Sequence, residues 1–320
     1  MRVLVTGASG FLGIAVVAVL AEHGHHVTAL TRTDLTRTGR PVPGSHRTLT
    51  GDVLDLASLD AAVADVDGVC HLAALVRARE SLEEPARYWR TNVGGTVNLL
   101  HALARTATRA RPKKIVLAST AAVYGHSGRQ PVDEEAPLRP GSPYGTSKLA
   151  ADQAAADVAA TGLVGAVSLR AFNIAGGMPG HHDRDTTRLI PKILAVQAGH
   201  ASELVVNGDG SAVRDFVHVL DMADAFARAL DACEPGEWRP YNVGSGRMTS
   251  IRDVLVAAEQ VTGRPVPVRH GPAAPEPPVS LADPSRIQND LDWRPKRSDL
   301  PQILTDAWSA LPARPPDGQR

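Results

Sequence analysis

The chain opens with Val3-Leu4-Val5-Thr6-Gly7-Ala8-Ser9-Gly10-Phe11-Leu12-Gly13, which sets three glycines between an apolar run and a helical pattern. The first glycine permits a tight turn without a Cβ clash. The second lets the backbone approach a pyrophosphate, and the third lets the helix pack closely on the strand. Unpaired N–H groups at the helix start attract an anion. The stretch therefore predicts a dinucleotide-binding turn, with the spacing G-x-x-G-x-x-G.

The first half of the chain alternates short β-branched runs with helical stretches, as parallel sheets with helices on both faces do. We expect strands over 2–5, 26–30, 69–72, 114–118 and 166–170, with helices over 11–22, 56–63, 87–106 and 144–159. The fold class is α/β, a Rossmann-type doubly wound parallel sheet with a smaller C-terminal α/β domain. Ligands of such sheets bind at the carboxyl ends of the strands.

The second half is less regular. Helical patterns cover 188–198, 221–232 and 251–262, the last after Ser250 as N-cap. Proline and glycine concentrate in 264–278, which predicts a loop that faces a ligand.

Composition excludes several classes of protein. The 320 residues are 43% hydrophobic and 21% charged, which is typical of a folded globular chain. Thirty-four basic and thirty-four acidic residues cancel, so charge gives no reason to expect nucleic acid or an anionic membrane as partner. No pattern of metal ligands stands out, and we expect no metal.

The apolar run Val3–Leu20 superficially resembles a secretory signal. Its regularly spaced glycines favour strand, turn and helix instead, and no other stretch reaches the roughly 18–20 apolar residues of a membrane span. The two cysteines, Cys70 and Cys233, cannot form a disulfide framework and fit a reducing compartment. We expect a cytoplasmic protein.

The residues after the second strand bear on the choice of dinucleotide. Folds that prefer NAD usually place an acid there to bond the ribose 2′-hydroxyl. This chain has Thr31-Arg32, and Arg32 would attract a 2′-phosphate, as in NADP. Alternatively, Arg32 is a solvated charge, and Asp34 or a backbone group meets the ribose. In Gly51-Asp52, Asp52 could lie beside the adenine, although such a pair is often only a turn.

Tyr144 and Lys148 share one face of a helix that opens with Ser142 as N-cap and Pro143 as first residue. A free phenol has a pKa near ~10. Lowering it to about 7 takes ~4 kcal/mol of preferential stabilisation of the phenolate. A lysine ammonium and a cationic nicotinamide ring could supply this in a desolvated site. The phenolate could then take a proton from a sugar hydroxyl.

Thr120 follows the strand 114–118 at its carboxyl end, in Ser119-Thr120-Ala121-Ala122-Val123-Tyr124-Gly125. It could bond the same sugar oxygen. The alternative is a strand-end hydroxyl that only caps the backbone.

The chain resembles the extended short-chain dehydrogenase/reductases, and most closely the UDP-glucose 4-epimerases and related nucleotide-sugar epimerases. The resemblance covers nearly the whole chain. Its motifs are the glycine turn, His71-Leu72-Ala73-Ala74, Asn92-Val93-Gly94-Gly95-Thr96, 119–125, Tyr144–Lys148, Leu169-Arg170-Ala171-Phe172-Asn173, Val213-Arg214-Asp215-Phe216-Val217-His218-Val219 and Ala282-Asp283-Pro284-Ser285.

The resemblance implies site residues by position. The catalytic residues would be Thr120, Tyr144 and Lys148. Cofactor contacts would come from Gly7, Gly10, Phe11, Leu12, Arg32, Asp52, Val53, Leu72, Ala73, Ala74, Asn92, Ala118, Tyr144 and Lys148. Substrate contacts would come from Thr120, Asn173, Arg188 and Arg214. The resemblance also implies a dinucleotide-binding domain over 1–172, with a returning segment near 215–246, and a nucleotide-sugar-binding domain over 173–320.

The same resemblance distinguishes between reactions. Dehydratases of this group carry an Asp-Glu pair after the threonine, and decarboxylating relatives keep the Glu. Here Ala121 and Ala122 stand at those positions and cannot move protons. The expected function is a 4-epimerase of the UDP-glucose/UDP-galactose type with bound NAD. The alternative is an NADPH-dependent reductase of 4-keto-sugar nucleotides. A homodimer is implied, with the helices that begin near Arg87 and Tyr144 packed across the two-fold axis.

One departure from the pattern concerns the substrate. Epimerases of this group usually have an arginine in the loop before Ala282-Asp283, followed by Gly-Asp. The loop here reads His270-Gly271-Pro272-Ala273-Ala274-Pro275-Glu276-Pro277, without it. A bidentate contact to the diphosphate is thereby lost unless another arginine, such as Arg269, supplies it.

Overall fold

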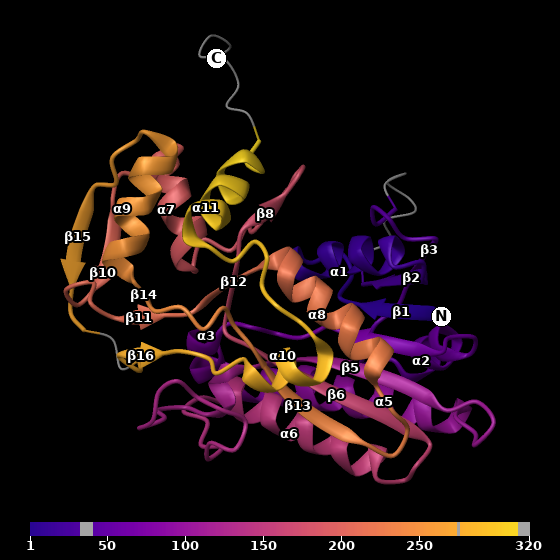
Figure 1. Ribbon diagram of the computed structural model, residues 1–320. Coiled ribbons are helices and arrows are strands. Elements are labelled where there is room, and N and C mark those ends of the chain that lie inside the picture. Colours follow the sequence, from indigo (N-terminus) through magenta and orange to yellow (C-terminus); the bar gives the residue numbers. More distant parts are fainter. Residues whose placement is uncertain (33–40, 274–275, 313–320) are drawn as a thin grey trace.

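A seven-stranded parallel sheet forms the larger part of the molecule (Figure 1). The computed structural model describes residues 1–32, 41–273 and 276–312; the alternative ribose partner Asp34 lies outside them. The strand order is β13-β6-β5-β4-β1-β2-β3. The strands are β1 (Arg2–Thr6), β2 (His26–Thr31), β3 (Arg47–Thr50), β4 (Gly68–His71), β5 (Lys113–Thr120), β6 (Val164–Ala171) and β13 (Trp238–Val243).

The strand order reverses at β1, whose neighbours are β2 and β4. The chain leaves β3 at one edge and returns beside β1 to form β4. A doubly wound sheet opens its ligand crevice at the carboxyl ends of the strands at such a reversal. The prediction of a Rossmann-type sheet is therefore confirmed.

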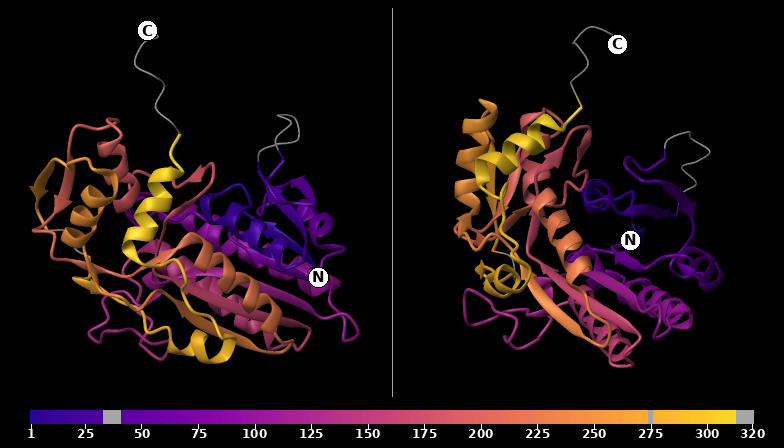
Figure 2. Two further views of the ribbon diagram at one scale, coloured as in Figure 1. Left: turned by 45° about the horizontal axis from the view of Figure 1, so that its top comes forward. Right: turned by 45° about the vertical axis from the view of Figure 1, so that its right-hand side comes forward.

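Helices cover both faces of the sheet and bury two separate apolar clusters (Figure 2). One face packs against α1 (Phe11–Glu22) and α8 (Val219–Ala232). The other packs against α2 (Leu56–Val63), α5 (Gly95–Thr106) and α6 (Pro143–Ala159).

Side-chain caps fix where several helices begin. The Asp55 carboxylate accepts from the backbone N–H of Ala57 at 3.1 Å at the start of α2. Ser142 caps α6 through Gly145 at 3.2 Å, with Pro143 in the first turn. Ser250 and Asp253 form a capping box on α9 (Ile251–Thr262), so the predicted N-cap is confirmed.

A smaller part of the molecule lies at the carboxyl ends of the large sheet (Figures 1 and 2). Its short strands are β7 (Asn173–Ala175), β8 (Gly177–Met178), β9 (His181–His182), β10 (Leu204–Asn207), β11 (Val213–Arg214), β12 (Phe216–His218), β14 (Thr249–Ser250), β15 (Val268–Gly271) and β16 (Val279–Ser280). Its helices are α7 (Leu189–Gln197), α9 and α11 (Leu300–Ser309), while α10 (Ser285–Leu291) lies by β13.

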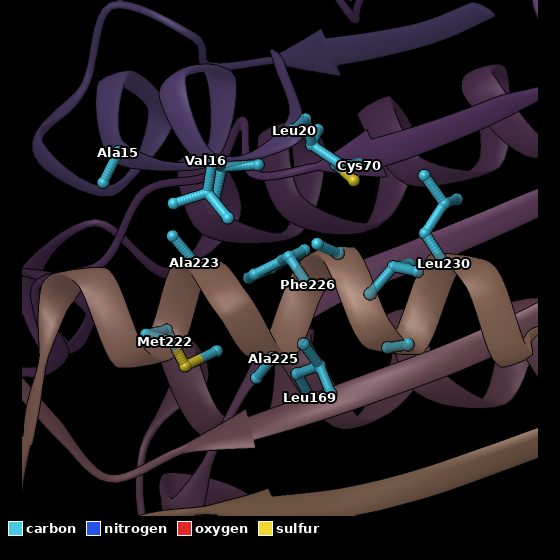
Figure 3. Packing of buried hydrophobic residues seen from close by; sticks show 14 of the residues in the cluster. Ala15, Val16, Leu20, Cys70, Leu169, Met222, Ala223, Ala225, Phe226 and Leu230 are labelled. Carbon is cyan, nitrogen blue, oxygen red and sulfur yellow. The ribbon is translucent and has the colours of Figure 1, made fainter. Parts of the chain in front are cut away.

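The core between α1 and α8 is built from small and medium side chains (Figure 3). Ala223, Phe226 and Leu230 of α8 face Val16 and Leu20 of α1, and Cys70 of β4 lies beside Leu20. Ala-rich helix faces let the two helices approach closely, and Phe226 fills the space between them. Both cysteines are buried and free.

The structure corrects two predicted elements. The expected continuous helix over 87–106 is α4 (Pro85–Tyr88), a π-helical segment (Trp89–Gly94) and α5. The expected loop over 264–278 contains β15, which pairs in parallel with β10. Pairing with a distant strand overrides the local proline and glycine signals there.

No helix in the described ranges is long and apolar enough to cross a membrane. The same ranges hold no group of three or more His, Cys, Asp or Glu side chains that could hold a metal ion.

Truncation of Phe226 tests the packing between α1 and α8. Its side chain is fully buried, so Phe226→Ala leaves a cavity and should lower the free energy of unfolding by about 3–5 kcal/mol. Val256→Ala is the matched control, because that side chain is 55% exposed on α9, and should cost under ~0.5 kcal/mol. Urea unfolding of both variants measures this, and equal losses would contradict the assignment of Phe226 to the core.

Candidate active site

The glycine turn joins β1 to α1 with its backbone against the segment that follows β4. Gly7 has a φ of +67°, and a Cβ there would lie 2.9 Å from the Ala73 nitrogen. A Cβ on Gly13 would lie 2.2 Å from the Gly7 carbonyl oxygen. The first turn of α1 carries no acidic side chain, so its N–H groups present an uncompensated positive end. The turn has the close backbone and the dipole that a dinucleotide phosphate needs.

A chain of buried hydrogen bonds holds this turn in place. The Thr6 hydroxyl accepts from the N–H groups of Leu72 and Ala73, both at 3.2 Å, and lies 2.8 Å from His71 Nδ1. His71 Nε2 lies 3.0 Å from the Thr96 hydroxyl, which donates to the Asn92 carbonyl at 2.6 Å. Thr6 therefore donates to Nδ1, and the Nε2–H group of a neutral His71 donates to Thr96.

Asn92 lies in the π-helical segment, and its amide is bonded to protein groups on both sides. It donates to the Leu75 carbonyl and to the Ser147 hydroxyl, both at 3.0 Å, and accepts from the Leu75 N–H at 2.8 Å. Asn92 thus ties the segment after β4 to the helix that carries Tyr144. π-helical turns often occur at functional sites.

The adenine-side candidates lie at neighbouring strand ends. β2 and β3 pair in parallel, so Arg32 and Asp52 both follow strands at the same edge of the sheet. The Asp52 carboxylate accepts from the Leu54 N–H at 2.9 Å, which is a turn contact. Val53 is buried, and Arg32 is exposed.

Thr120 and Tyr144 come together at the carboxyl end of β5. The Thr120 hydroxyl accepts from the Ala122 N–H at 3.2 Å, so the predicted backbone cap exists. Its own proton stays available, and its hydrogen bond to Tyr144 lowers the phenol pKa against the larger raising effect of burial. The Tyr144 N–H donates to the buried Ser81 hydroxyl at 3.0 Å, which places α6 against α3 (Ala78–Glu83).

Two cations lie near the reacting groups. Burial lowers the pKa of Lys148 to about 8, partly offset by the Asp152 carboxylate four residues on. The Asp152 carboxylate is itself held by Arg170 at 3.3 Å and by Ser119 at 2.9 Å. Arg188, at the start of α7, lowers the Tyr144 pKa electrostatically. Arg188 is thus close enough to favour the phenolate, and a direct effect of Lys148 on it stays a prediction.

Asn173 begins β7, which pairs with β12, and Arg214 ends β11, two residues before β12. The Asn173 amide donates to the Asp215 carbonyl at 2.9 Å. The Arg214 guanidinium donates to the carbonyls of Val213 and Pro277, both at 2.9 Å, and pairs with Glu276 at 3.1 Å. Both side chains therefore have protein partners in the smaller part of the molecule, and their contact with a substrate stays a prediction.

Several charged residues near the crevice escaped the sequence analysis. Arg77 pairs with Asp185 at 3.2 Å and Arg79 with Glu276 at 2.7 Å, across the two parts of the molecule. Asp183, which pairs at 3.0 Å with the predicted Arg188, was missed as well. Residues 77 and 79 match no motif, and their partners lie more than a hundred residues away.

A cavity of about 350 Å³ lies between α7 and α11. None of the predicted site residues is among the described residues that line it.

The sheet order and the glycine turn define the class of the protein: a nicotinamide-dinucleotide-binding protein of the short-chain dehydrogenase/reductase type. The model of the NAD dependent epimerase/dehydratase family matches residues 3–244. The chain belongs to this family, and the predicted resemblance is confirmed.

Similar proteins align with nearly the full length of this chain. The UDP-glucose 4-epimerase of Corynebacterium glutamicum is 38% identical, over 97% of this chain and 95% of the relative. The solved structure of a UDP-glucose-4-epimerase from Stenotrophomonas maltophila, with bound NAD and formylated UDP-arabinopyranose, is 32% identical with a TM-score of 0.88 and 97% of both chains covered. That from Bifidobacterium longum, in complex with NAD+ and UDP, is 29% identical with a TM-score of 0.86, covering 97% of this chain and 98% of that chain.

The buried His71 makes the free energy of unfolding depend on pH. Burial holds its pKa at about 3, whereas the unfolded chain takes up a proton near pH 6.5. Its contribution is complete above pH 6.5 and is lost as pH falls towards 3, at about 1.4 kcal/mol per pH unit. His71→Gln should lower stability at pH 8 but make its fall between pH 6 and 4.5 shallower by about that slope. Urea unfolding across this range measures it, and an unchanged slope would contradict the neutral His71.

Proposed function

We propose that this protein is an NAD-dependent nucleotide-sugar 4-epimerase that interconverts UDP-glucose and UDP-galactose or a closely related pair. The observation that carries the proposal is the Thr120–Tyr144 pair at the carboxyl end of β5, followed by Ala121 and Ala122. The pair can move one proton, and the two alanines offer no acid or base for dehydration. The relatives named UDP-glucose 4-epimerase support this substrate class.

The glycine turn fits a dinucleotide. A Cβ on Gly7 or Gly10 would meet backbone atoms at 2.9 and 3.2 Å, so the tight turn at the start of α1 has little room for a side chain at either position. In this proposal Gly7, Gly10, Phe11 and Leu12 hold the phosphates of NAD. When bound, NAD accepts a hydrogen with its electron pair from sugar C4 and returns it to either face of that carbon.

The remaining cofactor contacts follow the edge of the sheet. Those proposed for the adenine and its ribose are Arg32, Asp52 and Val53. Those proposed for the nicotinamide side are Leu72, Ala73, Ala74, Ala118, Tyr144 and Lys148. Asn92 would act indirectly, because its amide holds Leu75 and Ser147 next to these nicotinamide-side residues.

Tyr144 is the proposed proton carrier. Its phenolate takes the proton of the C4 hydroxyl and returns it after the sugar has turned. Burial alone raises the phenol pKa, so the fold relies on the Thr120 hydrogen bond and nearby positive charge to counter that effect. Arg188 supplies such a charge, and we propose Lys148 as a second.

The nucleotide sugar would bind between the two parts of the molecule. Asn173, Arg188 and Arg214 are the proposed contacts from the smaller part. In this proposal residues 1–172, with the returning segment near 215–246, bind the dinucleotide, and residues 173–320 bind the nucleotide sugar.

Arg32 favours a second candidate, a reductase of 4-keto-sugar nucleotides that uses NADPH. It follows β2, where a 2′-phosphate would lie, and it is exposed. An epimerase recycles its dinucleotide, whereas a reductase consumes it, so the two candidates differ in cofactor retention and stoichiometry.

We propose a homodimer in the cytoplasm. Trp89, in the π-helical segment, is 43% exposed and Val97, in the first turn of α5, is 46% exposed, which supports an interface there. The two free, buried cysteines agree with a reducing compartment. Light scattering of the purified protein tests the dimer.

Removal of the Tyr144 hydroxyl tests the proton carrier. Tyr144→Phe should lower kcat for UDP-galactose by about 10²–10⁴-fold, while NAD content and fold are retained. Tyr241→Phe is the matched control: this buried phenol bonds Asp290 at 3.1 Å, away from the site, and its loss should leave kcat within a factor of two or so. A Tyr144→Phe enzyme that keeps most of its rate would refute the assignment.

The released cofactor distinguishes the two candidate functions. Denaturation of purified protein should release NAD in nearly equimolar amount, and turnover of UDP-galactose should proceed without net change at the absorbance band of reduced nicotinamide. Stoichiometric oxidation of added NADPH with a 4-keto-sugar nucleotide would instead establish the reductase.

A further inference from the structure

Two arginines from different parts of the molecule share one carboxylate. Arg79 of α3 lies 2.7 Å from Glu276 Oε1, and Arg214 of β11 lies 3.1 Å from Glu276 Oε2. Both arginines hold the pKa of Glu276 below its usual range, although burial acts to raise it. The two guanidinium groups are therefore brought to opposite oxygens of one carboxylate, although residues 79 and 214 are far apart in sequence.

The donors of the two arginines are used to different extents. The Arg214 side chain is 16% exposed, and its N–H groups donate to two carbonyls as well as to Glu276. Arg79 is 71% exposed, and Glu276 is its one partner in the part of the chain that the structure describes. A guanidinium has five N–H donors, so most of those on Arg79 stay available for an anion.

The charges at this point are unbalanced. Arg79, Arg214 and Glu276 sum to +1. Arg77 and Arg188, by contrast, pair with three carboxylates, those of Glu80, Asp183 and Asp185, and leave no positive charge over. A ligand anion gains most where positive charge is left over, and a guanidinium pair matches phosphate oxygens in geometry.

Arg269 was the replacement expected for the missing loop arginine. It lies on β15, which pairs with β10, and its Nε lies 2.7 Å from Glu203. Glu203 precedes β10 at the outer side of this two-stranded sheet, and neither residue pairs with Arg214 or Glu276. Arg269 therefore has its own carboxylate away from the shared one.

The backbone of Arg79 belongs to a helix that is hydrogen-bonded to Tyr144. Arg79 lies two residues before Ser81, whose hydroxyl accepts from the Tyr144 N–H at 3.0 Å. Arg214 precedes the segment that bonds Asn173. Arg79 and Arg214 are thus close in the chain to the groups that bond Tyr144 and Asn173, which the proposed function assigns to the substrate.

We propose that Arg79 is a substrate-binding residue that takes the place of the missing loop arginine: together with Arg214 it binds the diphosphate of the nucleotide sugar, from the opposite side of the crevice. This inference rests on the proposed function. Glu276 orients the two guanidinium groups and leaves their remaining donors to the phosphate oxygens. Binding of the diphosphate would thus join the two parts of the molecule.

Calorimetric titration of the holoenzyme with UDP and with uridine tests the proposal. Arg79→Ala should weaken UDP binding by about 10–100-fold, because a charge-assisted contact to phosphate is lost, and should leave uridine binding within about twofold. Arg79→Lys should recover part of the loss, because a charge without the planar fork remains. Arg269→Ala is the matched control, an exposed arginine with a single carboxylate partner, and should bind UDP as the wild type does.

The outcomes separate this inference from the proposed function. UDP binding that is unchanged in Arg79→Ala, or weakened in Arg269→Ala instead, overturns the role of Arg79 while the epimerase proposal stands. Equal weakening of UDP and uridine shows a loss of structure rather than of a phosphate contact, and also overturns it. Wild-type enzyme that binds no UDP overturns the proposed function and this inference together.

Discussion

The close approach of backbone at the first turn is the constraint on which the rest of the structure depends. α1 can pack on β1 only because no Cβ stands at Gly13, where it would lie 2.2 Å from the Gly7 carbonyl oxygen. The same turn meets the segment after β4 because Gly7 lacks a side chain and has a positive φ. From there, Thr6, His71 and Thr96 carry the contact to Asn92 and the π-helical segment. One steric requirement in the first thirteen residues thereby positions groups that lie eighty to ninety residues later.

The elements that were predicted from sequence are those whose signals are local. The helix over 11–22 and its turn, the helix over 56–63 and the capped helix over 251–262 each carry their own apolar pattern and boundary residues. β13 was missed because Pro240 lies within it, and an edge strand of the sheet tolerates a proline that a central strand would not. β15 was missed for a similar reason, since only its pairing with β10 makes the segment a strand.

In the candidate site, too, some residues could be found from local sequence signals and others could not. Thr120, Tyr144 and Lys148 could be found because a strand end and an i, i+4 spacing on a helix are visible in the chain. Arg79 and Glu276 could not, because their contact joins positions 197 apart and neither belongs to a repeated pattern. The π-helical bulge around Asn92 was equally hidden, since its helical periodicity looks continuous in sequence. Local chemistry was therefore predictable, and charge pairs across the crevice required the coordinates.

The buried charges of Lys148, Asp152 and Arg170 cost the folded protein stability. Burial lowers the pKa of Lys148 to about 8, so at neutral pH the protein keeps an ammonium group where a neutral side chain would be more stable. The Asp152 carboxylate offsets part of this cost, but it is buried too and needs Arg170 and Ser119 in turn. An apolar set of side chains of similar size would remove all three costs at once. Lys148 and Asp152 follow Tyr144 on the same helix, and these buried charges therefore agree better with the chemistry proposed for the site than with a role in the stability of that helix.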